Sequence, residues 1–449
     1  REREEMGWAL RVDGAAFVAG CAAPLLCLLR SFRGTRRGRT LCAELSSKSV
    51  GALRWEAQRK GCISSLRLVQ SPSALSDPPP GCATVDVRAV GLNFADVFAL
   101  LGLYSASPPV PFTPGLEFSG VVSAVSGADS STAQEFVVGD EVMGVSFFGA
   151  YATKVNVPFV QLRRKPSHWS FAEAAAFPVQ ALTAWYALYD LGGLRDSSDR
   201  KEAPLVLINS VAGGVGLNAV RICQALGATV IGSVSSASKK QWLCAHGILD
   251  AEHVMVRDSS WSSSQFERAV RATVQAVHGK RDGVDIVLDA VGADVFRGSM
   301  GALARGGRMV TFGSADYMSA CGDRPRWLEL IWRYLRRPTI DPGMLMRENR
   351  SVMGFNLIWM MDRAEQLGAS MAALERCLRI HDSPPTAASD RDGHESRSPA
   401  PFVGVELPFS QAPAAVKQLQ TGRTVGKVVL IVPALNNLSA HAQSPSPPS

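Results

Sequence analysis

The sequence lacks the residue spacings that hold metal ions in proteins. Its nine cysteines stand singly along 449 residues, and no two of them form a CxxC pair. The seven histidines form no HxxxH pair. Zinc sites are built from such groups, so the spacing predicts no metal site. Scattered cysteines without a disulfide framework also indicate a reducing compartment.

The main body of the sequence also lacks an excess of charge. Nearly all of the formal net charge of +7 lies in the first 60 residues, which hold 12 Lys and Arg against 6 Asp and Glu. A nucleic-acid surface needs a concentrated basic patch, so no nucleic-acid partner is expected. Hydrophobic residues make up 46% and charged residues 19%, as in globular proteins, and the length fits roughly two to four domains.

The first hydrophobic stretch is too short to cross a bilayer comfortably. Residues 14–29 are apolar but fall below the ~20 residues of a membrane span and contain Pro24. Residues 30–40 are basic and contain no acid, as in transit peptides. We therefore expect residues 1–60 to be a leader that directs the protein to a plastid or, alternatively, a mitochondrion. If they are only a disordered extension or mistranslated upstream sequence, as Arg1 in place of Met allows, the protein is expected to be cytoplasmic.

Two further segments have almost nothing to bury. Residues 381–401 are rich in Ser, Pro, Asp and Arg, and residues 435–449 form a similar tail. Segments of this composition cannot offset the entropy cost of folding, so both are predicted to be disordered.

The remaining chain changes its hydrophobic period along its length. From Ala83 onward, short stretches alternate apolar and polar residues between Gly and Asp turn signals, which is typical of a small β-rich domain. A helical stretch is expected at residues 171–194. Continuous apolar strands and helices then alternate, at 204–209, 216–227, 229–234, 237–247, 284–292 and 308–313. This alternation predicts a doubly wound α/β domain on a parallel sheet.

A glycine-rich turn lies between the first of these apolar strands and the helix after it. The turn contains Gly213, Gly214, Val215 and Gly216, and Val211 replaces the first glycine of the usual GxGxxG pattern. Such glycines let the backbone approach a pyrophosphate, and the helix N-terminus offers free N–H groups. The strand, turn and helix context therefore predicts a dinucleotide site, and the alternative is a purely structural turn.

The end of the next strand indicates which dinucleotide is bound. NAD sites place an acidic residue there for the ribose, whereas NADP sites avoid the acid and supply a cation. The stretch GSVSSASKK contains no acid. Ser235, Ser236 and Lys239 are candidates to meet a 2′-phosphate with hydroxyl groups and a positive charge. The pattern favours NADPH, and the alternative is that the lysines only begin an exposed helix.

Nine stretches, taken in order, carry a resemblance to a known family. They are GLNFADVFALLGLY, PFTPGLEFSGVV, VGDEVMG, AAAFPVQALTAWYAL, VAGGVG, VDIVLDAVG, GGRMVTFG, NRSVMGFNL and GRTVGKVVLIV. As a set they resemble the zinc-free quinone oxidoreductases, the ζ-crystallin-like branch of the medium-chain dehydrogenase/reductase superfamily. The resemblance covers residues 83–432 apart from the insertion, and two of its last stretches resemble most the vesicle-membrane-protein subgroup.

The resemblance implies an α/β fold with two domains and a cleft between them. A GroES-like β-rich catalytic domain is expected at residues 61–178 and 350–434, interrupted by the insertion at 381–401. A Rossmann domain with a doubly wound parallel sheet is expected at residues 179–349. Relatives of this branch are usually homodimers, so a homodimer is expected here.

The resemblance also implies that no zinc takes part. Zinc-dependent relatives carry a cysteine where Asn93 stands and a histidine where Leu116 stands, and neither an amide nor an aliphatic side chain replaces these ligands. Glu117 is expected to be a structural hydrogen-bond acceptor. Without a Lewis acid, a saturated alcohol is hard to oxidise. We therefore expect an NADPH-dependent enzyme that reduces quinones or α,β-unsaturated carbonyls.

In related enoyl-thioester reductases, a tyrosine in the pattern NxxDxxxxxGxY donates a proton. Asn93, Asp96 and Tyr104 match this spacing. Tyr104 is therefore a candidate general acid and Asn93 a candidate to hold the nicotinamide or the substrate carbonyl. The alternative for Tyr104 is a pocket-lining role, and Asp96 is expected to be structural.

Three more cofactor contacts follow from the resemblance alone. Thr183 is expected near the nicotinamide ribose, and Gly313 and Ser314 are expected near the nicotinamide. Each of the three has a packing role as its alternative.

Two other functions remain open at this stage. The first is an enoyl-thioester reductase. The second is a non-catalytic NADPH-binding structural or membrane-associated protein, since basic and aromatic residues share the expected helix at residues 324–338. We favour the interpretation that this helix packs over the cofactor cleft or at a subunit interface.

Overall fold

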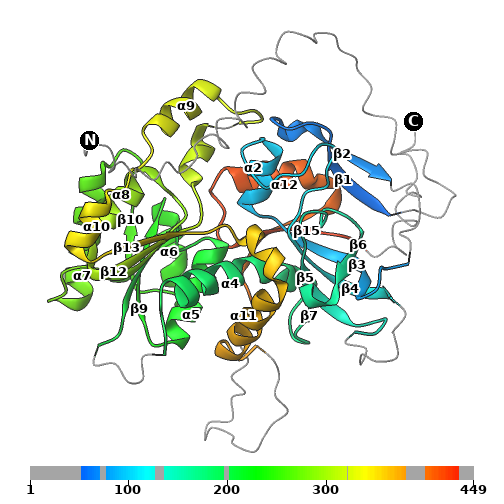
Figure 1. Cartoon of the computed structure of the whole chain (residues 1–449), viewed down its shortest axis with the longest axis horizontal. Helices are drawn as coiled ribbons and strands as arrows, with labels where there is room; N and C mark the ends of the chain where they lie inside the picture. Colours follow the sequence, from blue (N-terminus) through cyan, green and yellow to red (C-terminus); the bar gives the residue numbers. More distant parts are fainter. Residues whose placement is uncertain are drawn as a thin grey trace, which may run out of the picture.

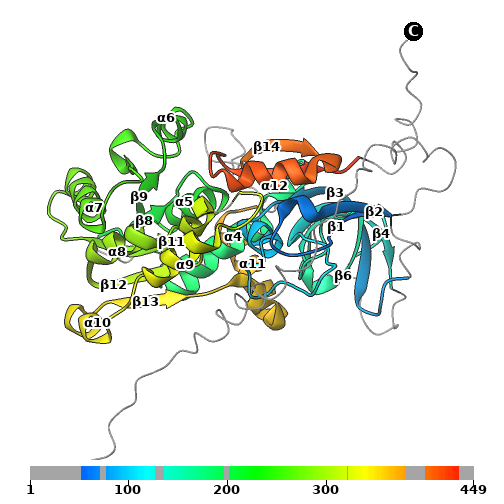
Figure 2. The same ribbon diagram turned by 90° about the horizontal axis from the view of Figure 1, so that it is seen from above.

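Two domains, each built around its own sheet, lie side by side in the computed structural model (Figures 1 and 2). The structure describes residues 52–70, 77–126, 136–196, 202–320, 322–380 and 400–433. The expected leader up to residue 51, the insertion up to residue 399 and the tail at 435–449 lie outside these ranges. No helix in the described ranges is both long and apolar enough to cross a bilayer.

A seven-stranded sheet forms the β-rich domain, in the order β14, β15, β3, β4, β5 and β7, with β6 paired to β3. Its strands are β3 (Cys82–Gly91), β4 (Glu117–Val125), β5 (Glu141–Val145), β6 (Lys154–Pro158), β7 (Leu162–Arg164), β14 (Val403–Pro408) and β15 (Lys427–Ile431). Only β14 and β15 pair in parallel. The buried side chains of Val85, Val87 and Ala89 confirm the strand predicted from Ala83.

A hairpin before this sheet corrects the expected end of the leader. β1 (Leu53–Ala57) pairs antiparallel with β2 (Leu66–Gln70). Trp55 is buried, and its indole Nε1 donates a 2.9 Å hydrogen bond to the carbonyl of Phe409. The folded domain therefore begins before residue 60, because the apolar side chains of β1 belong to the core of the β-rich domain.

A six-stranded parallel sheet forms the second domain, in the order β10, β9, β8, β11, β12 and β13. Its strands are β8 (Leu205–Asn209), β9 (Thr229–Val234), β10 (Val254–Val256), β11 (Val284–Asp289), β12 (Leu303–Thr311) and β13 (Ser351–Gly354). This is the Rossmann strand order, and the order reverses between β8 and β11. The expected α/β architecture, a β-rich domain beside a Rossmann domain with a parallel sheet, is confirmed.

Helices cover both faces of the parallel sheet. Every residue of its central strand β8 is therefore buried. On one face, α4 (Pro178–Trp185), α5 (Gly214–Ala225), α6 (Ala237–Ala245) and α11 (Ala364–Cys377) contribute apolar side chains to one core. On the other face, α7 (Ser263–His278) and α8 (Ala293–Gly301) contribute to a second core. Side chains of β8 point alternately into these two cores, as a strand buried on both faces requires.

The chain returns to the β-rich domain later than expected. β13 pairs in parallel with β12, so residues 351–354 are the edge of the Rossmann sheet. Met371 and Leu374 of α11 then pack into the Rossmann core. The expected boundary at residue 350 is therefore wrong, and the return begins with β14.

The remaining helices belong to the β-rich domain or to the segment between β12 and β13. In the β-rich domain these are α2 (Phe94–Leu100), α3 (Phe171–Ala175) and α12 (Ala412–Gln420), and between β12 and β13 they are α9 (Trp327–Leu335) and α10 (Pro342–Glu348). α10 packs against the second core, away from the junction of the domains (Figures 1 and 2). α2 packs against α12 (Figure 1). α2 and α9 both supply residues to the cleft described next.

Candidate functional site

A cleft of about 1240 Å³ lies between the two domains. Its walls include the residues that directly follow β8, β9, β11 and β12, together with α2 and the start of β15. Open α/β sheets bind ligands beyond the carboxyl ends of their strands, at the point where the strand order reverses. The cleft is therefore the candidate functional site.

Nearly all residues singled out in the sequence meet at this cleft. The Rossmann domain contributes Gly213, Gly214, Val215, Gly216, Ser235, Lys239, Gly313 and Ser314 to its walls. Asn93 and Tyr104 reach it from the β-rich domain, and Thr183 reaches it from α4. Ser236 does not line the cleft: it caps α6, where its hydroxyl accepts a hydrogen bond from the backbone N–H of Lys239.

The glycine turn is closely packed at Gly214 and Gly216. Gly213 is the N-cap of α5. A Cβ atom on Gly216 would lie 2.4 Å from the carbonyl oxygen of Val211, and one on Gly214 would lie 2.6 Å from Oε1 of Gln180. Ser210, at the start of the turn, has a φ of 61° and accepts a 2.9 Å hydrogen bond from the N–H of Gly213. The turn and the N-terminus of α5 thus fit a dinucleotide pyrophosphate.

Two cations flank the cleft beside this turn. Nζ of Lys239 donates a 2.6 Å hydrogen bond to the carbonyl of Gly422, and burial together with the charge of Arg257 lowers the pKa of Lys239 to about 8. Arg257 directly follows β10, and its Nη2 donates a 3.4 Å hydrogen bond to the hydroxyl of Ser210. Its Nη1 is buried and has no hydrogen-bond partner among the described residues. The 2′-phosphate of NADPH fits this place, since it would supply acceptor oxygens to both cations.

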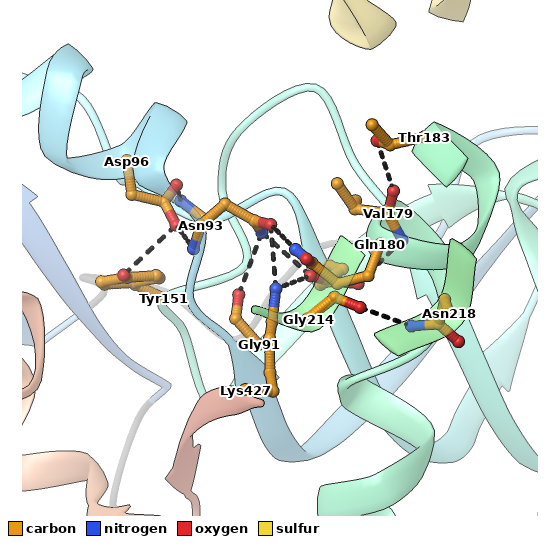
Figure 3. A network of polar contacts seen from close by, with 12 residues as sticks. Gly91, Asn93, Asp96, Tyr151, Val179, Gln180, Thr183, Gly214, Asn218 and Lys427 are labelled. Carbon is orange, nitrogen blue, oxygen red and sulfur yellow. Dashed lines mark hydrogen bonds and ion pairs between the residues drawn. The ribbon is translucent and has the colours of Figure 1, made fainter. Parts of the chain in front are cut away.

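A buried polar cluster lies on the catalytic side of the cleft (Figure 3). It consists of Asn93, Glu117, Gln180 and Lys427, which come from the start of α2, from β4, from α4 and from β15. Nζ of Lys427 donates hydrogen bonds of 2.9 Å to Oδ1 of Asn93 and 2.5 Å to Oε1 of Glu117. The side chains of Lys427 and Glu117 are 3% and 0% exposed, so this is a fully buried ion pair.

Both ends of the Asn93 carboxamide are already engaged in this cluster. Its Oδ1 also accepts a 2.6 Å hydrogen bond from Nε2 of Gln180, and its Nδ2 donates 2.9 Å to Oε1 of Glu117. The second oxygen of Glu117 accepts 2.8 Å from the backbone N–H of Val179 at the start of α4. The second N–H of Nδ2 donates a long, 3.4 Å hydrogen bond to the carbonyl of Gly91, so the predicted role of Asn93 in holding a carbonyl requires that this contact be exchanged.

Asp96 holds the backbone around Asn93. Its carboxylate accepts hydrogen bonds from the backbone N–H of Asn93 at 2.8 Å and of Gly115 at 3.1 Å, and from the hydroxyl of Tyr151 at 3.4 Å. Burial raises the pKa of Asp96 to about 7, against the opposing effect of these backbone donors and of Lys427. Asp96 is 0% exposed and does not line the cleft, which agrees with the structural role expected for it.

Tyr104 lies on the cleft wall and reaches the Rossmann side. Its hydroxyl donates a 2.8 Å hydrogen bond to Oδ1 of Asn356, in the segment that follows β13. Burial raises the pKa of Tyr104 to about 12, so the phenol keeps its proton throughout the neutral range. Thr183 donates a 2.6 Å hydrogen bond to the carbonyl of Val179 in its own helix.

Comparison with known proteins identifies the family. A model of the alcohol dehydrogenase GroES-like domain matches residues 79–167, and a zinc-binding dehydrogenase model matches residues 214–367. The human synaptic vesicle membrane protein VAT-1 homolog is 30% identical over 371 residues, which cover 83% of this chain and 84% of that protein. The chain belongs to the medium-chain dehydrogenase/reductase superfamily.

Solved structures of superfamily members agree with this assignment. A mycobacterial protein solved in complex with NADPH is 26% identical, with a TM-score of 0.65 over 85% of this chain and 100% of that one. The CurK enoyl reductase is 24% identical and shares the fold, with a TM-score of 0.64 over 85% of this chain and 99% of that one. The resemblance drawn from the nine sequence stretches is confirmed.

The donor set of the polar cluster is not that of a zinc site. An amide, an ammonium group and one carboxylate meet in this cluster, and Leu116 beside it on the cleft wall contributes only an aliphatic side chain. Within the described residues, no three or more His, Cys, Asp and Glu side chains are grouped so that they could hold a metal ion.

Four residues of the site were missed in the sequence. Lys427 is the one charged residue in the apolar stretch VGKVVLIV, and that position is the signal that could have found it. Arg257 directly follows the strand next to β9, so a cation there could have been connected with the phosphate. No local signal marks Gln180 or Asn356, because their partners come from other elements.

Proposed function

We propose that the protein is an NADPH-dependent, zinc-independent reductase of quinones or α,β-unsaturated carbonyls. The observation that carries this proposal is the cleft itself. At one end it offers Lys239 and the unpartnered Nη1 of Arg257, and at the other it offers Tyr104 beside a cluster without a zinc donor set. The name of a related solved structure, a mycobacterial quinone oxidoreductase at 26% identity, supports the same reaction class.

The Rossmann side of the cleft would hold the cofactor. The glycine turn and the N-terminus of α5 would bind the pyrophosphate, and Ser235, Lys239 and Arg257 would bind the 2′-phosphate. Bound NADPH would supply a hydride to the electron-poor carbon of a conjugated acceptor. The residues that follow β9, at 235–240, include no acid that would bind an unphosphorylated ribose.

The catalytic side of the cleft would hold the acceptor. Phe94, Phe98, Leu103 and Met318 give it an apolar wall that excludes water from an aromatic or alkenyl group. Tyr104 holds its proton on Oη against Asn356 and can donate it to a basic oxygen or carbon of the acceptor. Quinones can also take protons from solvent, so both roles of Tyr104 are compatible with the proposal.

Cofactor oxidation tests the proposal directly. The purified chain is mixed with NADPH and a series of quinones and enones, and the loss of the nicotinamide absorbance is followed. We expect NADPH consumption with several acceptors and much slower consumption of NADH. No turnover across the whole series would remove the enzymatic proposal.

A second candidate within enzymes is an enoyl-thioester reductase. The observation that favours it is the placement of the Tyr104 hydroxyl on the cleft wall, in the spacing that this group of reductases uses for proton donation. Faster turnover of enoyl thioesters than of quinones in the same series would select this candidate.

A non-catalytic, membrane-associated protein that binds NADPH is the candidate from another class. α9 exposes Leu328, Trp332 and Leu335, which are 86%, 54% and 73% exposed. The same helix also supplies Trp327 and Leu330 to the cleft wall, which agrees with the packing that we favoured for it. Tight NADPH binding without any acceptor, together with sedimentation on lipid vesicles, would favour this candidate.

A further inference from the structure

We infer that Lys427 is a positioning residue that makes Gln180 present its carbonyl oxygen to the nicotinamide half of the bound dinucleotide. This inference rests on the cofactor assigned under the proposed function. It concerns a chain of hydrogen bonds that runs from Lys427 through Asn93 and ends at Gln180, which lies beside Gly214 of the glycine turn (Figure 3).

The hydrogen bonds from Lys427 to Gln180 have a fixed donor-to-acceptor direction, because an ammonium group can only donate. Asn93 must therefore turn Oδ1 toward Lys427, and this oxygen lies 2.9 Å from Nζ. Its Nδ2 then faces Glu117, which as a carboxylate can only accept, at 2.9 Å. The opposite orientation of the amide would set donor against donor and acceptor against acceptor. The ion pair thus determines which way the Asn93 amide points.

The orientation of Asn93 sets that of Gln180 in turn. Oδ1 of Asn93 accepts, so Gln180 must offer its Nε2, at 2.6 Å. Its Oε1 is then left on the side of Gly214, where it would lie 2.6 Å from a Cβ atom on that glycine. Gln180 is a wall residue of the cleft. The cleft therefore meets a hydrogen-bond acceptor at this point instead of an NH₂ group.

The position of Gln180 decides which part of the ligand it meets. Lys239 and Arg257 mark the phosphate end of the cleft, and Tyr104 marks the acceptor end. The glycine turn at Gly214 lies between them and would hold the pyrophosphate. The half of the dinucleotide that continues from Gly214 toward Tyr104 carries the nicotinamide. Its ribose hydroxyls and its carboxamide NH₂ are donors, which complement Oε1 of Gln180.

The backbone ties Lys427 to the same turn. Gly426, the residue before it, has a φ of 66° and donates a 2.9 Å hydrogen bond from its N–H to the carbonyl of Ala212. Gly426 also forms an isolated parallel bridge with Gly213. The backbone that carries Lys427 is thus bonded directly to the turn that would hold the pyrophosphate, although the two belong to different domains.

The test variants remove the groups that set the donor-to-acceptor direction of these hydrogen bonds. The substituted side chains have about the same volume as the original ones. Lys427→Met alone would leave Glu117 as an unpaired buried charge, and such a variant can fail to fold. The double variant Lys427→Met/Glu117→Gln removes both charges, and the new amide lets Asn93 and Gln180 reverse. Gln180→Met removes the acceptor and leaves the ion pair intact. The matched control is Lys154→Met/Asp86→Asn, which neutralises a partly exposed pair between β3 and β6 at 2.5 Å.

Two ligands separate positioning from general damage, and neither requires turnover. NADPH contains the nicotinamide half, whereas 2′,5′-ADP contains only the half that Lys239 and Arg257 would bind. We expect both the double variant and Gln180→Met to raise the Kd for NADPH about 5- to 10-fold and to leave the Kd for 2′,5′-ADP within about twofold. Combining Gln180→Met with Lys427→Met/Glu117→Gln should raise the Kd for NADPH no further than either variant does by itself, because both changes act on one contact. The control pair should bind both ligands as the wild-type chain does.

The outcomes distinguish this inference from the proposed function. Wild-type affinity for NADPH in the double variant would overturn the role of Lys427 and leave the proposed function standing. An equal rise in the Kd for NADPH and for 2′,5′-ADP would also overturn the role of Lys427, since that pattern indicates damage to the whole cleft. A wild-type chain that binds neither nucleotide would refute the proposed cofactor and the inference together.

Discussion

Replacing Arg257 with methionine should weaken the binding of NADPH and leave the binding of NADH unchanged. The guanidinium is buried beside the cleft, its Nη2 reaches Ser210 at 3.4 Å, and its Nη1 has no partner among the residues that the structure describes. NADH has no 2′-phosphate to offer this nitrogen. The two nucleotides therefore differ in the one group that Arg257 is expected to bind.

The magnitude follows from the kind of hydrogen bond that is lost. A hydrogen bond to a charged group contributes roughly 1.5–3 kcal/mol, which corresponds to about a 10- to 150-fold change in Kd. Lys239→Met should have an effect of similar size. The combined variant Arg257→Met/Lys239→Met should bind NADPH and NADH with almost equal Kd. Because the 2′-phosphate lies far from the reacting carbon, kcat at saturating NADPH should change little. Calorimetric titration of each variant with NADPH and with NADH measures these values.

Stability provides an independent readout of the same variant. A buried guanidinium nitrogen without a partner destabilises the folded state, and methionine removes that cost. Arg257→Met should therefore melt at the same temperature as the wild-type chain or slightly higher, although it binds NADPH less tightly. Lys240→Met, at the neighbouring residue that does not line the cleft, is the control for Lys239→Met. A lower melting temperature with equal loss of NADPH and NADH affinity would show that Arg257 only supports the fold, and would refute the assignment.

Three further predictions concern other parts of the cleft. Tyr104→Phe should lower kcat with enoyl thioesters by on the order of 10²-fold and leave quinone turnover nearly unchanged, which steady-state kinetics will check. Since burial and Arg257 lower the pKa of Lys239 to about 8, its charge is present at pH 7 and is lost above pH 8. The Kd for NADPH should therefore rise between pH 7 and 9 while that for NADH stays constant. Gly216→Ala should lower stability by about 1–3 kcal/mol in denaturant unfolding, because the new Cβ would lie 2.4 Å from the carbonyl oxygen of Val211.

The fold could be predicted where the sequence signal is local. β8 reads as a continuous apolar run because both of its faces are covered, and β3 alternates because its side chains differ in burial. The two boundaries that were predicted wrongly have no such local signal in the sequence. β13 has only four residues, none of them fully buried, and its place is set by pairing with β12. β1 stands next to the basic leader, and only its hairpin with β2 and the contact of Trp55 with Phe409 mark it as folded.

The residues of the site likewise fall into those with a local sequence signal and those without one. The glycine turn, Lys239 and Tyr104 line the cleft and belong to short stretches, so local patterns could single them out, with the family resemblance needed for Tyr104. Lys427 acts on Asn93 across 334 residues of sequence, and Tyr104 meets Asn356 across 252. Such pairs form only when β15 and the segment after β13 return to the cleft, and no window of the sequence contains both partners.

The polar cluster explains why an asparagine stands at residue 93. A carboxamide accepts at one atom and donates at the other, so it can bridge an ammonium and a carboxylate without carrying charge. Asn93 does this between Lys427 and Glu117, and the three side chains together are electrically neutral. An acceptor that gains negative charge in the cleft therefore faces an oriented but neutral group, with the positive charge of Lys427 bound to Glu117. This arrangement suits an acceptor that delocalises its own negative charge, such as a quinone or an enone, because it needs hydrogen bonds more than a Lewis acid.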